Sequence, residues 1–174
     1  MIYPDNNQKR SRKSFKGILI AAGGIAAGFL ISRIFFLSFS VANASMGPGL
    51  VPGDRVIIMK YLSPARGDIV LLRSPAEPDR VLLRRIIAAD GDSVEVKNGI
   101  IYVNDTILRP SWKVAQKDKR VFPMYFSLRD NMPVIRVKRG EFFVLGDNPD
   151  HAFDSRIFGV VHENALIGKA VYGF

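Results

Sequence analysis

The feature that most constrains this chain is an uncharged run of fifteen residues, GILIAAGGIAAGFLI, which begins at Gly17. Ser32 and Arg33 interrupt the run, and a second apolar stretch continues to about Ser40. Residues 17–40 are long enough for a tilted transmembrane helix if the Arg33 side chain extends toward the membrane interface. We therefore expect one membrane-spanning helix over residues 17–40.

The charge before this run predicts its orientation. Residues 1–16 contain five basic residues against one acidic residue, a net charge of +4 within the chain's total of +9. By the positive-inside rule, residues 1–16 are expected to form a cytoplasmic head, and residues 41–174 an extracytoplasmic domain on a cell membrane. No basic stripe interleaved with aromatic residues follows, so no nucleic-acid partner is expected.

The tripeptide Ala42-Asn43-Ala44 allows a different interpretation. It has the small-x-small form after which a secretory signal peptide is cut, and such a cut would make Ser45 only a new N-terminus. Against this, the apolar stretch continues past Arg33 and exceeds the usual length of a signal-peptide core. This pattern favours an anchor.

The chain beyond the anchor has the pattern of a β protein. Short runs rich in Val and Ile, separated by Gly, Pro, Asn and Asp, occupy residues 54–60, 67–72, 81–89, 93–104, 141–147 and 165–174. Asn98-Gly99 predicts a tight hairpin turn, because both central residues of such a turn need a positive φ. Residues 106–133 contain three prolines and the single Trp, and we interpret them as an insertion or small subdomain. The chain has no cysteine, which excludes disulfides, Cys-ligated zinc and thiol nucleophiles.

Four motifs follow one another in a specific order. They are SMGPGLVPGD from Ser45, ARGDIVLL from Ala65, LLRRIIAADGDSVEVKNGIIYVN from Leu82 and GDNPDHAFDSRIFG from Gly146. Together they resemble the type I signal peptidases, membrane-bound serine proteases that remove signal peptides from exported preproteins. The resemblance covers most of residues 41–171 apart from residues 106–133.

The resemblance implies a mainly antiparallel β fold with an apolar membrane-facing surface, attached to one N-terminal transmembrane helix. It implies that Ser45 is the nucleophile, that the Ser45 backbone N–H and the Asn43 side chain form the oxyanion hole, and that Met46 lies near the substrate pocket. The implied substrates are preproteins cut after small-x-small sequences. The implied partners are the lipid bilayer and, for a non-catalytic relative, a partner peptidase or the secretion machinery. No cofactor or metal ion is implied.

One position departs from the family pattern in a way that affects the chemistry. The family uses a buried neutral lysine as general base, and Arg84 occupies that position here. A guanidinium has a pKa above 12 and does not readily collect a proton from serine. Many members also carry a serine that orients the lysine, and the corresponding residue here is Ala152. The sequence therefore predicts that activity by the Ser/Lys route is absent or severely reduced.

The remaining polar residues of the last motif have two interpretations. His151 is an alternative base, which with Ser45 and Asp154 would form a Ser-His-Asp arrangement. Asp154 and Arg156 are interpreted as an ion pair that braces the active-site loop, and Asp147 as further structural support. Two functions stay open: an endopeptidase with altered or reduced activity, and a non-catalytic relative that binds signal peptides or assists an active peptidase.

Overall fold

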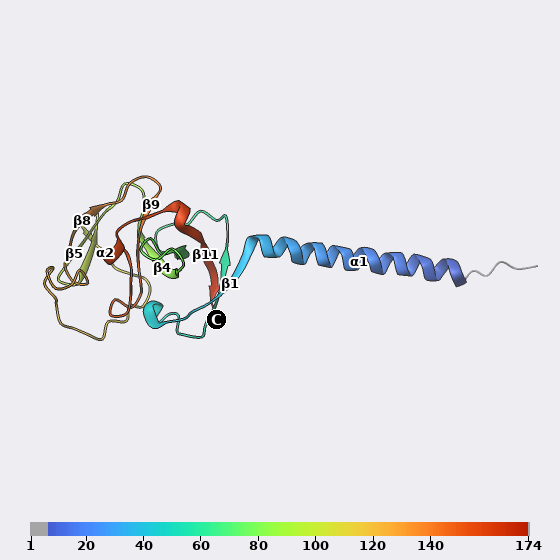
Figure 1. Ribbon diagram of the computed structural model, residues 1–174, viewed down its shortest axis with the longest axis horizontal. Coiled ribbons are helices and arrows are strands. Elements are labelled where there is room, and N and C mark those ends of the chain that lie inside the picture. The colour runs from blue at the N-terminus through green and yellow to red at the C-terminus, as the bar shows by residue number, and fades with distance from the viewer. Residues whose placement is uncertain (1–6, 174) are drawn as a thin grey trace, which may run out of the picture. The chain divides into compact units, whose positions relative to one another are not determined.

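A computed structural model describes residues 7–173 of the chain (Figure 1). Contacts divide the chain into two units, with the boundary between Phe36 and Leu37. The first contains helix α1 (Asn7–Phe35), in which Gly17–Phe35 is apolar and long enough to cross a membrane. This fits the expected span by length and composition, although the predicted end at residue 40 is wrong.

The helix ends five residues early because the next residues form strand β1 (Phe36–Ser40). Strand β1 pairs with β2 (Arg55–Met59) at the edge of a sheet. The Phe39 side chain packs against the buried cluster that contains Met46 and Val56. Residues 36–40 thus form sheet hydrogen bonds and bury an apolar side chain, where the hydropathy pattern predicts the last turns of the helix.

The second unit is built on two antiparallel sheets, as the fold class predicts. The larger sheet has seven strands in the order β1-β2-β11-β3-β4-β9-β10. Its remaining strands are β3 (Ile69–Arg73), β4 (Val81–Ala88), β9 (Glu141–Leu145), β10 (Val161–His162) and β11 (Leu166–Gly173). Two short 3₁₀ helices, η1 (Ala44–Met46) and η2 (Glu163–Ala165), and one short α-helix, α2 (Ser155–Phe158), lie in its connections.

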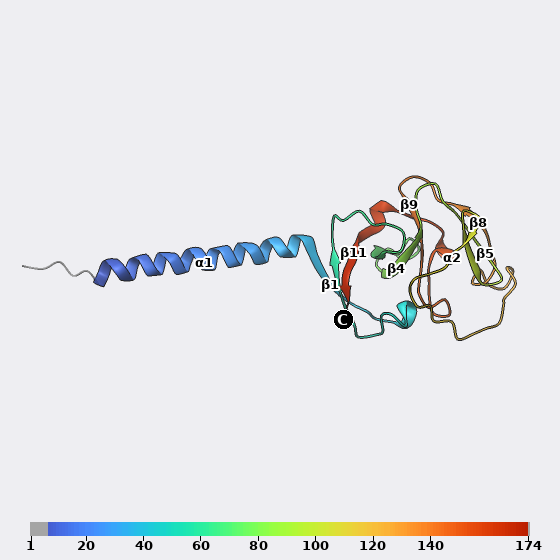
Figure 2. The ribbon, with the colours of Figure 1, turned by 180° about the vertical axis from the view of Figure 1, so that it is seen from behind.

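The smaller sheet has four strands in the order β7-β6-β5-β8. They are β5 (Ser93–Lys97), β6 (Ile100–Val103), β7 (Thr106–Ile107) and β8 (Met132–Arg136). Figures 1 and 2 show β5 and β8 at one end of this unit and β1 and β11 at the other, with β4 and β9 between them. The segment predicted as an insertion, residues 106–133, begins in β7 and ends in β8, and the chain between these two strands is irregular.

The turn predicted at Asn98-Gly99 is present. Asn98 has φ 50° and Gly99 φ 78°, and the two residues join β5 to β6. Gly67 also has a positive φ, 94°, and the carboxylate of the adjacent Asp68 accepts a hydrogen bond from the Ala65 N–H at 2.7 Å. The Asn98-Gly99 turn sets the register between β5 and β6.

Strand β4 brings two arginines into the interior. It lies between β3 and β9, and the residues of both neighbouring strands are largely buried. Arg84 is itself buried, so its charge must be compensated by polar partners within the protein. Those partners define the candidate site.

Candidate active site

Ser45 lies in η1, and a second loop fixes its backbone. The Asn148 N–H donates to the Ser45 carbonyl at 3.0 Å, and the Asn148 side-chain amide donates to the Ala44 carbonyl at 3.1 Å. The Asn43 side chain caps η1 by accepting a hydrogen bond from the Ser45 N–H at 3.1 Å. These contacts fix the backbone of Ser45, which is buried.

Gly146 allows the two loops to approach closely. A Cβ atom at this position would lie 2.7 Å from the Ser45 carbonyl oxygen and 2.5 Å from the Ala152 Cβ. Real Cβ atoms do not come so close to backbone, so a side chain at Gly146 would displace Ser45. The close approach of the two loops thus explains why the last sequence motif has a glycine at position 146.

Arg84 is the hydrogen-bond partner of the Ser45 hydroxyl. Its Nη1 donates to the Ser45 Oγ at 2.8 Å and also to the Leu83 carbonyl. Its Nε and Nη2 donate to the Phe153 carbonyl at 3.0 and 2.8 Å. The guanidinium is therefore held in a single orientation in which it donates to the serine.

The electrostatic surroundings keep this guanidinium charged at neutral pH. Burial lowers the pKa of Arg84 to about 10, and the negative charge of Asp154 opposes that shift. At pH 7 a group with such a pKa is neutral in about one molecule in a thousand. A protonated guanidinium has no lone pair with which to accept the serine proton.

Asp154 and Arg156 form the ion pair that the sequence analysis expects. Asp154 is fully buried, and its carboxylate accepts from the Arg156 Nε at 2.9 Å and Nη2 at 2.6 Å. The same carboxylate accepts from the Gly146 N–H at 3.0 Å and caps α2. Asp154 thus connects α2 to the Gly146 loop behind Ser45.

Asp147 supports the same loop from its other side. Its carboxylate accepts from the Arg85 Nε at 2.8 Å and Nη2 at 2.5 Å. The Arg85 guanidinium lies 4.5 Å from the centre of the Trp112 ring, a cation–π distance. The site predicted from the sequence does not include Arg85, Trp112 or Asn148. Of these, Asn148 lies within the last sequence motif.

The structure does not assemble the alternative Ser-His-Asp arrangement. His151 lies in an exposed turn, and within the described residues no hydrogen bond connects its imidazole to Ser45 or Asp154. Ser45 and Asp154 bond instead to Arg84 and Arg156. His151 therefore has no base-like geometry here.

Asn43 makes a contact that the expected oxyanion hole does not include. The prediction has the Asn43 amide and the Ser45 N–H donating together to a substrate oxyanion, and in the structure the Asn43 side chain accepts from that N–H.

Met46 is buried in an apolar cluster with Val41 and Leu83, and it also lines a cavity beside Ser45. That cavity measures about 30 Å³ and is also bordered by Ala42, so it has room only for a small side chain.

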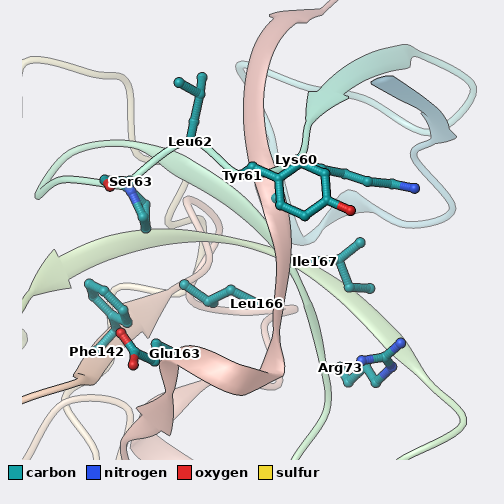
Figure 3. A pocket seen from close by; sticks show the side chains of 11 residues that line it. Lys60, Tyr61, Leu62, Ser63, Arg73, Phe142, Glu163, Leu166 and Ile167 are labelled. Carbon is teal, nitrogen blue, oxygen red and sulfur yellow. The ribbon is translucent and has the colours of Figure 1, made fainter. Parts of the chain in front are cut away.

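A larger hollow of about 540 Å³ lies elsewhere, between the end of β2 and β11, and it contains neither Ser45 nor Arg84. Figure 3 shows its lining side chains, among them Lys60, Ser63, Arg73 and Glu163. The ammonium of Lys60 points away from Ser63, so these two residues do not form a serine–lysine pair. The candidate site at Ser45 and Arg84 therefore lies outside this hollow.

The chain is similar to one known protein family and to several characterised proteins. The model of the family described as "Signal peptidase, peptidase S26" matches residues 12–174. "Signal peptidase I" of Bacillus amyloliquefaciens is 30% identical over 164 residues, which is 91% of this chain and 82% of the relative. "Signal peptidase I V" of Bacillus subtilis is 30% identical over 145 residues, 79% of this chain and 85% of the relative. A crystal structure of a signal peptidase I from Enterococcus faecalis is 27% identical, with a TM-score of 0.48 over 62% of this chain and 97% of that chain.

Proposed function

The chain belongs to the signal peptidase family, peptidase S26, whose members cleave signal peptides, and on that premise we propose that it binds exported preproteins and cleaves them slowly. In this proposal Ser45 is the nucleophile, and Arg84 occupies the position of the general base. Small side chains before the cut enter the cavity beside Ser45. Cleavage follows a small-x-small sequence.

The hydrogen bond of 2.8 Å from Arg84 to the Ser45 Oγ carries this proposal. It supports the assignment of Ser45, because a nucleophile and its partner are expected within hydrogen-bond reach. It also supports slow turnover, because the charged guanidinium donates to the serine and only its small neutral fraction can receive the serine proton. Loss of general-base catalysis typically costs about 10²–10⁴-fold in rate.

The apolar helix Gly17–Phe35 supports a membrane anchor in this proposal. The basic residues before it favour a cytoplasmic N-terminus and an extracytoplasmic β domain. Strand β1 and η1 follow α1 directly, so Ser45 is ten residues beyond the last helical residue, Phe35. A preprotein that leaves the bilayer would meet the serine soon after its own apolar segment ends.

The first test compares the wild-type chain with Ser45→Ala on a preprotein that carries a small-x-small site. We expect slow cleavage by the wild type and none by Ser45→Ala, with equal affinities, since the hydroxyl contributes little to binding. Single-turnover rates and dissociation constants measured in detergent check this. Cleavage that survives in Ser45→Ala would refute Ser45 as the nucleophile.

The pH profile tests the role of Arg84. Because burial lowers the pKa of Arg84 to about 10, its neutral fraction rises about tenfold per pH unit below that value. We expect kcat/KM of the wild type to rise with pH from 7 to about 10 and then to level off. A profile that does not rise above pH 7 would contradict a role for neutral Arg84 as the base, and a His151→Ala variant would then test the alternative base.

A second candidate function is binding without turnover. The observation that favours it is the fixation of Arg84, whose guanidinium donates to the carbonyls of Phe153 and Leu83 as well as to Ser45. Such a protein would present preproteins to an active partner peptidase. It differs from the first candidate in showing no Ser45-dependent cleavage at any pH.

A further inference from the structure

The β domain contains an apolar cavity that the proposed reaction does not use. We call it the Trp112 cavity, and its walls are formed mainly by apolar side chains such as Trp112, Ile101 and Leu145. These residues belong to the irregular segment after β7, to β6 and to the end of β9. The cavity measures about 310 Å³, and neither Ser45 nor Arg84 lines it. Small-molecule sites are mainly apolar and have volumes of about 300–1,000 Å³, so the Trp112 cavity has the size of a site for a small ligand.

Arg156 lines the Trp112 cavity, and part of its guanidinium has no hydrogen-bond partner. The Nε and Nη2 atoms donate to the Asp154 carboxylate, whereas Nη1 donates to no acceptor among the described residues. The exposed fraction of the Arg156 side chain is only 7%. In the described part of the chain every fully buried side-chain nitrogen has a partner, so Nη1 borders open space. The open spaces that Arg156 lines are the Trp112 cavity and a smaller cavity of about 60 Å³ that shares Ile101 with it.

Three other arginines of the β domain with little exposure differ from Arg156 in this respect. They are Arg84, Arg85 and Arg129. In each of them Nε, Nη1 and Nη2 all donate to oxygen atoms of the protein. A buried guanidinium is costly unless its N–H groups have acceptors. Among these four arginines Arg156 is therefore the exception, and its Nη1 has room for an acceptor from outside the chain.

The nearby carboxylates do not supply that acceptor. Asp147 lines the Trp112 cavity, but both of its oxygens accept from Arg85. The oxygens of Asp154 accept from Nε and Nη2 of Arg156, and the negative charge of Asp154 also acts on Arg84. Arg84 and Arg156 thus share one negative charge, and an added anion would balance the second guanidinium.

We propose that the Trp112 cavity binds a small monocarboxylate whose carboxylate accepts from the Arg156 Nη1 while its hydrocarbon body lies against Trp112 and Ile101. A carboxylate suits the Arg156 edge because charge-assisted hydrogen bonds from a guanidinium are strong and can be bidentate. A hydrocarbon body suits the remaining walls because burial of apolar surface is favourable. The proposal does not depend on the proposed function, since it involves neither a preprotein nor turnover.

A ligand in the Trp112 cavity would lie behind the loop that positions Ser45. Gly146 and Asp147 line this cavity, and the Gly146 N–H donates to Asp154, the partner of Arg156. A Cβ atom at Gly146 would lie 2.7 Å from the Ser45 carbonyl oxygen. The ligand site is thus separate from the small cavity beside Ser45, and the Gly146 loop connects the two.

Trp112, the single tryptophan of the chain, gives a direct test. The full chain in lipid nanodiscs is titrated with ω-bromo-octanoate, whose bromine quenches tryptophan emission on contact, and with the neutral ω-bromo-octanol as the matched probe. The Arg156→Lys variant keeps a positive charge for Asp154 and removes the free guanidinium edge. The Val114→Phe variant narrows the cavity. Its control is Val121→Phe, because Val114 and Val121 are 47% and 54% exposed and only Val114 lines the cavity.

We expect saturable quenching by ω-bromo-octanoate, with an affinity about tenfold or more above that of the alcohol, since a hydrogen bond between charged groups contributes at least that factor. Arg156→Lys should remove this preference. Val114→Phe should weaken the binding of both probes, and Val121→Phe should not. Quenching that does not saturate, equal affinities of the wild type for the two probes, or unchanged binding in Val114→Phe would overturn the proposal. If Arg156→Lys does not fold, the two probes compared on the wild type still test the carboxylate.

Discussion

The Arg84→Lys variant should cleave a small-x-small preprotein at neutral pH about 10²–10⁴-fold faster than the wild type. The Arg84 site is buried, and burial lowers the pKa of a lysine far enough to populate its neutral, proton-accepting form. Lysine has an ordinary pKa near 10.4 and needs a much smaller shift than arginine. The measurement is kcat/KM at pH 7 with the full chain in detergent.

Two further variants make this result specific. Arg85→Lys changes the neighbouring arginine of β4, which pairs with Asp147 and forms no hydrogen bond with Ser45, so it should give no gain. Adding Ala152→Ser to Arg84→Lys supplies the hydroxyl that many relatives use to orient the lysine, and it should raise the rate further. A wild type that already cleaves as fast as Arg84→Lys would show that another base operates.

The Asp154→Ala variant should lose about 3–5 kcal/mol of stability, because it leaves the buried Arg156 without its counter-charge. The loss also removes the cap of α2 and the hydrogen bond to the Gly146 N–H. Urea unfolding of the full chain in detergent, followed by the fluorescence of the single Trp112, measures this.

The chain contains a matched control for this substitution. Asp118 accepts from the backbone N–H, Nε and Nη2 of Arg120, the same pattern that joins Asp154 to Arg156 two residues later. Arg120 is largely exposed, so Asp118→Ala should shift the unfolding midpoint only slightly. If Asp154→Ala proved as stable as Asp118→Ala, burial would not be what makes the first pair important. Asp154→Asn, which keeps the volume, covers the case in which the alanine variant does not fold.

Local patterns were sufficient to predict the main strands and turns. The runs rich in Val and Ile became β2, β3, β4, β5, β6, β9 and β11, because β-branched side chains suit a buried sheet. Strand β1 was not predicted, since its apolar residues continue the hydropathy of α1 without a break. The helix end depends on pairing with β2, a contact between distant residues that a local pattern does not contain.

The candidate site could also be predicted only in part, because some of its contacts do not follow from residue type. The motifs pointed to Ser45, Arg84 and the Asp154–Arg156 pair, and the structure places all four together. The direction in which the Asn43 side chain bonds was not predictable, because its amide can donate or accept. The Phe153 carbonyl, which accepts from Arg84, is a backbone group, so the residue type at position 153 does not indicate this contact.

The hydrogen bond from the Ser45 N–H to Asn43 has a consequence for the energetics of catalysis. An oxyanion that forms on the substrate must take this donor from an amide oxygen that already holds it. The stabilisation gained is then the difference between two hydrogen bonds, because only interactions that strengthen between ground state and transition state accelerate a reaction. In the proposed reaction the Asn43 side chain thus competes with the substrate oxyanion for the Ser45 N–H, and an inhibitor that mimics the tetrahedral intermediate would meet the same competition.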